Sequence, residues 1–294
     1  MSTNLKTLRN RINSISGTKK ITKAMKMIAI NKSNKSKKIS KIARYYPEIC
    51  QNILQNIIYR YETDNLKEVS ILDKILFKKT VTPPENRSLF LIFSTDKGLC
   101  GGINTAIINQ VNKSIDSLKS KNFKLIIFGK KAKIAFSKKY QENILGTYPA
   151  CNNVSESVLV VQDSVNQILQ MVETNQIDNI LLYYTYSENS LTQNVQAEKI
   201  LPIAIDPNFK GQESIIEGKN ILLQTLKQYI FGKIHNALIE SYVSEQNAKL
   251  VAMDNATKNA EDMITNLTLM LNSLRQDKIT KEITEICAGA EASS

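Results

Sequence analysis

The first 44 residues contain no Asp or Glu, although thirteen of them are Lys or Arg. The chain of 294 residues has a formal net charge of +12, and the part after residue 44 carries 26 basic and 27 acidic side chains. The excess positive charge therefore belongs to one N-terminal arm. Such an arm suits nucleic-acid phosphate or the acidic side chains of a protein partner, unless it is only a solvated polar helix.

Other scarce residues further limit the possible folds and kinds of site. Tryptophan is absent, and ten Gly and six Pro are few for this length, which favours long helices over a design made only of sheet. A single histidine, His235, excludes metal clusters that need several histidines. The four cysteines are far apart and form no CxxC pair, which argues against a zinc site or a disulfide framework and predicts free thiols. They are Cys50, Cys100, Cys151 and Cys287.

Long apolar segments are also missing. No run approaches the ~18 apolar residues that a membrane-spanning helix needs. The segment after Met1 has no apolar core of the kind found in secretory signals. At 42% hydrophobic residues the chain can nevertheless bury a substantial core.

The N-terminal part, residues 1–60, has the pattern of a long helix. Its apolar residues follow a 3-4 spacing, with apparent jumps in phase that would locally unwind a supercoil. The three sets are Leu5, Leu8, Ile12 and Ile15; then Ile21, Met25 and Ile28; then Ile39, Ile42, Tyr46, Ile49 and Ile53. Gly17 is a weak point in this helix. Pro47 is expected to kink the helix or to mark a boundary.

The C-terminal part, residues 211–294, also predicts a long helix. Between Gly232 and Gly289 there is no Gly or Pro, and a single helix over that stretch would be ~84 Å long. A compact domain cannot enclose such a helix, so much of it should project. An apolar stripe in water needs a partner, and the two terminal helices most simply pair with each other in antiparallel orientation.

The residues between these helices have an α/β pattern. Buried-strand runs at 88–93, 123–128 and 179–186 alternate with helical patterns at about 103–119, 130–139 and 155–175. This order predicts a parallel, Rossmann-like sheet. We therefore predict an α/β protein with an antiparallel coiled coil, divided into an N-terminal helix (1–60), a linker (61–87), a central α/β domain (88–210) and a C-terminal helix (211–294).

Few residues suggest catalysis. The glycine-rich segment 95–104 follows a strand and opens a helix, which is where phosphates bind in α/β folds. It lacks both the G-x-G-x-x-G spacing and the Walker Lys-Ser/Thr ending, so Gly98, Gly101 and Gly102 are interpreted as a structural turn. Cys100 has no base partner that the sequence suggests. We expect no catalytic residue, no cofactor and no metal.

Three separated motifs resemble the gamma subunit of F-type ATP synthases. KITKAMKMIA at 20–29 is similar to the family's N-terminal helix motif, STDKGLCGGIN at 94–104 to its central turn, and ITKEITEICAGA at 279–290 to its C-terminal signature. The order and spacing of the motifs agree over essentially the full length.

The resemblance implies a non-catalytic rotor. In the family, the paired terminal helices turn inside a ring of alternating alpha and beta subunits. The base of the shaft rests on a membrane ring of c subunits beside the epsilon subunit, and delta belongs to the same complex. Proton flow turns the ring and the shaft, and ATP chemistry occurs on the beta subunits. The implied location is peripheral on the cytoplasmic side of the cell inner membrane. The matrix side of the mitochondrial inner membrane is the alternative, although no presequence is apparent.

The resemblance also implies contact residues. An acidic loop of the beta subunit suits the basic arm, and Glu217 corresponds to the carboxylate that faces the c ring. Lys249 stands where the family usually has Arg, and Lys cannot form a bidentate fork with a carboxylate. The beta-subunit contacts implied are Lys19, Lys20, Lys23, Met25, Lys26, Lys249, Gln276, Thr280, Glu282, Thr284 and Glu285.

Each of these contacts has a plainer interpretation. Met25 could serve only in coiled-coil packing. The polar residues near the C-terminus could form an exposed face with i,i+4 pairs such as Lys278–Glu282 and Lys281–Glu285. The close cysteine pair of the chloroplast form is absent, so no redox switch is expected. Nucleic-acid binding would rest on the basic arm alone, and an independent α/β enzyme would lack polar residues with matched roles.

Overall fold

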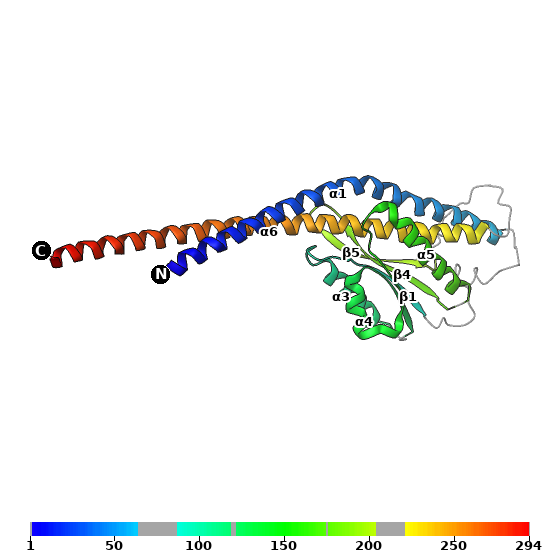
Figure 1. Ribbon diagram of the computed structural model, residues 1–294. Helices are drawn as coiled ribbons and strands as arrows, with labels where there is room; N and C mark the ends of the chain where they lie inside the picture. The colour runs from blue at the N-terminus through cyan, green and yellow to red at the C-terminus, as the bar shows by residue number, and fades with distance from the viewer. Residues whose placement is uncertain (1, 64–86, 119–121, 175, 204–220, 294) are drawn as a thin grey trace. The chain divides into compact units, whose positions relative to one another are not determined.

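A computed structural model describes residues 2–63, 87–118, 122–174, 176–203 and 221–293 (Figure 1). The chain forms two compact units. One comprises Met1–Ala29 and Lys249–Ser294, and the other comprises Ile30–Ala248. Most of the predicted linker, and Glu217, lie outside the described residues.

Two long helices contribute to both units. Helix α1 spans Ser2–Thr63 and helix α6 spans Ile221–Ser293. Pro47 lies inside α1, so the interpretation of Pro47 as a helix boundary is wrong. The proline packs closely against Gly232 of α6, where a Cβ atom would lie only 3.1 Å from Pro47 Cβ.

The two helices are antiparallel within each unit. In the first unit Lys19 contacts Glu261, and further along α1, Lys26 contacts Asp254. In the second unit Ser33 bonds to Asn247 and Ser40 bonds to Glu240. Residue numbers rise along α1 as they fall along α6, which confirms the predicted antiparallel pairing.

The seam of α1 differs from the predicted one. One continuous series of non-exposed residues follows a 3-4 spacing along the helix, so the predicted phase jumps are wrong. The seam positions are Leu5, Leu8, Ile12, Ile15, Lys19, Thr22, Lys26, Ala29, Ser33, Ser36, Ser40, Ala43, Pro47, Cys50, Leu54 and Ile57. Small and polar side chains occupy the middle of this seam, because α6 carries polar groups opposite them.

The third apolar set predicted for the seam lies on the exposed side of α1. Ile42 is 72% exposed and Ile49 is 57% exposed, whereas Ser40 and Ala43 beside them are buried. Ile39, Tyr46 and Ile53 complete this exposed apolar stripe. Hydrophobicity alone therefore identified the wrong face of the helix.

The central sheet has five strands in the order β3-β2-β1-β4-β5. The predicted runs are β1 (Ser88–Phe93), β2 (Phe123–Phe128) and β4 (Asn179–Ser187), and β1 pairs in parallel with both of the others. The sequence pattern did not reveal β3 (Ile144–Tyr148) or β5 (Gln193–Leu201). Since β5 pairs antiparallel with β4, the sheet is mixed and the expectation of an entirely parallel sheet is wrong.

Alternate strand residues face two different layers. Phe90 and Ile92 pack with α3 (Ile103–Asp116) and α4 (Lys130–Tyr140), which is followed by the 3-10 turn Gln141–Asn143. Leu89, Leu91 and Phe93 pack with α5 (Val154–Glu173), α1 and α6 (Figure 1). The three predicted short helices are confirmed, with ends that differ by a few residues.

Candidate functional site

The basic segment of α1 divides into two groups of lysines. Lys19 lies 3.0 Å from Glu261, and Lys26 lies 2.6 Å from Asp254. Lys20 and Lys23 are exposed, and they form no ion pair with any residue that the structure describes. Two of the four predicted contact lysines therefore bind the neighbouring helix, and two face outward.

Two lysines form ion pairs with the Asp254 carboxylate. Lys26 of α1 approaches one carboxylate oxygen, and Lys258, one turn along α6, lies 3.3 Å from the other. These hydrogen bonds, with that from Lys26 the stronger influence, lower the pKa of Asp254 below its usual value. The carboxylate is therefore ionised throughout the neutral range, and it holds Lys26 against α6.

The remaining predicted residues near this segment are partly buried. Met25 and Lys249 are both half-buried, and each lies beside the seam on its own helix. Lys249 already interacts with a neighbouring group in the structure. This position is compatible with both interpretations of Met25, as a residue that packs in the coiled coil and as a contact for a partner subunit.

The C-terminal segment of α6 is exposed on all sides. Every residue from Arg275 to Ala290 is exposed, which includes the five predicted contact residues of this segment. Lys278 and Glu282 form the predicted i,i+4 pair at 3.2 Å, whereas Lys281–Glu285 is not among the ion pairs of the described residues. The Thr284 hydroxyl donates to the backbone oxygen of Thr280 at 2.8 Å.

The glycine-rich turn is held by its own side chains. Asn104 accepts from the Thr95 amide at 3.1 Å and donates to the Thr95 hydroxyl at 2.8 Å. Gly101 has φ +61°, a conformation that favours glycine, while added Cβ atoms at Gly98 and Gly102 would meet nothing within 4 Å. Cys100 and Ile103 then pack on Ala248 of α6. The turn thus attaches the sheet to the long helix.

A carboxylate occupies the neighbouring helix start. Asp96 Oδ1 accepts from the Lys130 amide at the start of α4 at 2.9 Å. A helix N-terminus attracts anions, and here the anion is a side chain of the same chain. This arrangement leaves that terminus poorly suited to a phosphate group.

A serine and a histidine that could serve as nucleophile and base lie next to each other. Ser157 Oγ lies 3.1 Å from His235 Nε2, a pairing across 78 positions that sequence reasoning missed. Burial lowers the pKa of His235, so the ring is neutral at pH 7. No carboxylate among the described residues is hydrogen-bonded to this histidine, so the pair lacks the orienting acid of a catalytic triad.

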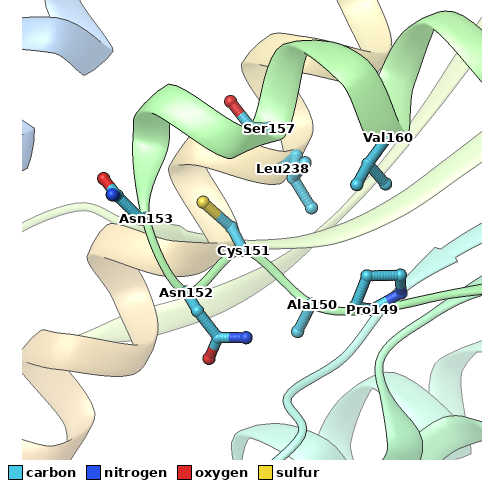
Figure 2. Close-up of a pocket in the computed structure, with 8 residues that line it drawn as sticks. All are labelled: Pro149, Ala150, Cys151, Asn152, Asn153, Ser157, Val160 and Leu238. Carbon is cyan, nitrogen blue, oxygen red and sulfur yellow. The ribbon is translucent and has the colours of Figure 1, made fainter.

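The adjacent cavity is small. Its volume is about 100 Å³, and it lies among the loop before α5, the start of α5 and Leu238 of α6 (Figure 2). Figure 2 shows the Cys151 side chain within this ring of lining residues. Small-molecule sites are usually several times larger.

A second, open cavity of about 280 Å³ lies between α1, α6 and strands β4 and β5. Its charges are largely paired with each other. Lys233 contacts Glu198 at 2.6 Å, and Arg44 contacts the buried Glu240 at 2.9 Å. Groups of three or more potential metal ligands were not found among the described residues. Within the same residues, no helix is long and apolar enough to cross a bilayer.

The residues that sequence reasoning missed lie mainly on the seam. Ser33, Ser40, Glu240 and Asn247 are buried polar residues that bond across the two helices. A search at seven-residue spacing for polar residues, rather than for apolar ones, could have found them.

Comparisons with known proteins agree on one family. A family model described as ATP synthase matches residues 4–292. The ATP synthase gamma chain of Rickettsia typhi is 36% identical, with 98% of this chain and 99% of the relative covered. That of Rickettsia prowazekii is 35% identical over the same shares.

Solved structures share the fold. A chain in the Euglena gracilis mitochondrial ATP synthase assembly of OSCP, F1 and c-ring in rotational state 3 has a TM-score of 0.66 and 17% identity, and the match covers 99% of this chain and 95% of that one. A chain of the rotor from the same organism in rotational state 1 has a TM-score of 0.63 and 15% identity, with 95% and 100% covered. Together with the family match, these results identify the chain as a member of the ATP synthase gamma chain family.

Proposed function

We propose that this chain is the central rotor of an F-type ATP synthase. In this role its paired helices turn inside the ring of alpha and beta subunits and couple proton flow through the c ring to ATP synthesis or hydrolysis on the beta subunits. The chain itself catalyses no reaction. The exposure of α6 from Arg275 to Ala290 on every side is the observation that carries this proposal.

A helical segment that is exposed on every side needs a partner. In proteins, packing of an apolar face normally supplies most of the stability of a helix. Ile279, Ile283 and Ile286 follow i, i+4 and i+7 spacing and are exposed by 46%, 56% and 71%. A surrounding ring of subunits would cover this apolar stripe, which lies on an otherwise polar and exposed helix.

The chemistry of this end also suits rotation. Gln276, Thr280, Glu282, Thr284 and Glu285 offer hydrogen bonds on the surface of the helix. Contacts of this exposed kind are weak, typically well below 1 kcal/mol for an ion pair, so they can break at each step. The small residues of 287–290 allow the end of the helix to turn within a narrow apolar collar.

Lys20 and Lys23 supply the proposed contact with the acidic loop of the beta subunit. Both are exposed and lack ion-pair partners among the described residues. Opposite charges ~4 Å apart attract by ~4 kcal/mol at an effective dielectric of 20 and by less at a wet surface. Several such attractions guide a moving surface without holding it in one position. Met25, Lys249, Lys19 and Lys26 lie in the same unit and complete the predicted set.

Further partners follow from the family. We propose that the epsilon subunit and the c ring bind the base of the shaft, with Glu217 as a c-ring contact and delta in the same complex. The exposed apolar stripe Ile39–Ile53 of α1 supports binding of a further subunit. The proposed location is peripheral, on the cytoplasmic side of the cell inner membrane, or on the matrix side in a mitochondrion. Neither a cofactor nor nucleic acid is required.

Purification tests the proposal directly. A tagged chain expressed in its own cells and extracted in mild detergent is expected to bring down the alpha, beta, epsilon and c subunits, with ATPase activity in the complex and none in the isolated chain. Recovery as a free monomer would contradict the rotor, as would salt-sensitive retention on DNA without these subunits.

Truncation tests the proposed contacts at the tip. A chain that ends before Ile279 should still assemble, because the sheet and the α1–α6 seam lie elsewhere, but ATP-driven proton pumping per ATP hydrolysed should fall. Gly289→Ala is a matched control, since its added Cβ meets nothing within 4 Å. If the truncated complex pumped as efficiently as this control, Thr280, Glu282, Thr284 and Glu285 would not be functional contacts.

A further inference from the structure

Four polar contacts between α1 and α6 recur at heptad spacing. The α1 donors Lys19, Lys26, Ser33 and Ser40 are each seven residues apart, and so are the α6 acceptors Glu261, Asp254, Asn247 and Glu240. The Lys19–Glu261 contact is 3.0 Å, while Lys26–Asp254 and Ser33–Asn247 are each 2.6 Å. We call each of these four contacts a rung, and two rungs lie in each compact unit.

We propose that these four rungs form a register ladder that fixes how α1 aligns with α6. In this assignment Lys19 and Lys26 are positioning residues of the shaft, and Lys20 and Lys23 are the lysines presented to the acidic partner. The proposal deepens the proposed function, because it divides the predicted contact lysines between two roles.

The ladder disfavours a shift of α6 along α1 by one helical turn. A shift of α6 by four residues in either direction places Leu250 or Lys258 opposite Lys26. The same shift places Val243 or Val251 opposite Ser33. A buried hydroxyl and amide would then lose their partners, which costs more than the bond itself contributes.

The buried rungs provide most of this discrimination. Ser33 and Asn247 are almost fully buried, and the Asn247 amide is held by Ser187 of β4 at 3.0 Å. Glu240 is likewise buried, and it accepts from both Ser40 and Arg44. Buried polar groups in a helix pair specify register at some cost in stability, as a single polar seam residue does in a coiled coil.

The rungs of the first unit are partly exposed but reinforced. Between Lys19 and Lys26, the hydroxyls of Thr22 and Thr257 lie 2.8 Å apart. Thr22 is buried, so this bond is shielded from water. Asp254 also holds Lys258, which fixes the carboxylate that receives Lys26.

Charge exchange distinguishes a ladder residue from a partner contact. In the assembled complex, Lys26→Asp and Asp254→Lys should each lower the ratio of protons pumped to ATP hydrolysed, because each substitution places two like charges opposite each other across the seam. The double variant Lys26→Asp/Asp254→Lys should recover the wild-type ratio, because the opposite charges again face each other. Lys23→Asp is the control, and adding Asp254→Lys should not rescue it.

A disulfide provides an independent replacement for the ladder. Cysteines at Thr22 and Thr257, in a Cys287→Ser background, should bridge the helices on oxidation, since the two hydroxyls they replace are already adjacent. Oxidation should restore the pumping ratio of the Lys26→Asp variant, and reduction should lower it again. A disulfide within the shaft cannot replace a contact between Lys26 and another subunit.

The outcomes separate the two proposals. If neither charge exchange nor the disulfide restored pumping, Lys26 would be a partner contact and the ladder assignment would be wrong. If the wild-type chain entered no complex with alpha and beta subunits, the proposed function would fail instead. Equal pumping by Lys26→Asp and the wild type would also refute the ladder.

Discussion

Replacing Gly232 by alanine should test how closely α1 approaches α6 at Pro47. A Cβ atom at Gly232 would lie 2.9 Å from Tyr46 Cδ1, 3.1 Å from Pro47 Cβ and 3.2 Å from Pro47 Cα. The Tyr46 ring can turn aside, because it is partly exposed. Pro47 cannot, because its ring and backbone are fixed within the helix. The contact therefore has to be relieved by separating the helices.

Two opposing effects set the magnitude. Alanine is favoured over glycine inside a helix by about 1 kcal/mol. Forcing an extra methyl group into a packed interface costs roughly 1–3 kcal/mol. Gly17→Ala isolates the first effect, since Gly17 lies within α1 and its added Cβ would meet nothing within 4 Å. The difference between the two variants therefore measures packing at Gly232, and it should be about 1–3 kcal/mol.

Thermal unfolding followed by circular dichroism measures this difference. For a domain of this size, 1 kcal/mol corresponds to about 2–4 °C, so Gly232→Ala should unfold about 2–12 °C below Gly17→Ala. Amide hydrogen exchange of β1 and β4 should also accelerate in Gly232→Ala and remain unchanged in Gly17→Ala, because Gly232 and the strands belong to one compact unit. If both alanines stabilised the chain equally, the close approach at Pro47 would be disproved.

Two further predictions concern the central unit. Gly129→Ala should destabilise it by about 3 kcal/mol or more, because Gly129 has φ +99° and its added Cβ would lie 2.4 Å from the Ser94 backbone oxygen; a denaturation midpoint equal to that of Gly98→Ala would contradict this. For His235, burial lowers the pKa from 6.5, so the unfolded chain binds more protons than the folded one below that pH and stability should fall as the pH drops from 6.5. His235→Phe, which preserves the stacking on Phe231, should show a smaller loss of melting temperature between pH 7 and pH 5, and an equal loss would assign the pH dependence to other groups.

The sequence predicted the sheet where strands are buried on both faces. The runs that became β1, β2 and β4 are continuous in apolar residues, as strands covered by helices on both sides must be. β5 was missed because it lies at the edge of the sheet and most of its side chains are partly or fully exposed, so its sequence is polar. β3 was missed because it is short, includes Gly146 and is only partly buried. Edge strands are less buried, so their sequences lack the apolar pattern that predicts a strand.

The terminal helices show the opposite difficulty. Their length and pairing were predictable from the scarcity of Gly and Pro, but the face that pairs was not. Apolar residues at 39–53 have ideal heptad spacing and still lie on the exposed face, while serines at 33, 36 and 40 form the seam. Ser33 and Ser40 bond there to Asn247 and Glu240, about two hundred residues away along the chain. A pattern that ranks residues by hydrophobicity cannot detect a seam built from hydrogen bonds.

The same distinction applies to the predicted contact lysines. A count of charge treats Lys19, Lys20, Lys23 and Lys26 alike, although the helix places the first and last on the seam and the middle two outside it. Only the acids at 254 and 261 reveal which lysines are already bound. A lysine held by its own shaft cannot also follow an acidic surface through a rotation without breaking the contact that positions it. The lysines most suited to a moving partner are therefore those that the shaft leaves exposed.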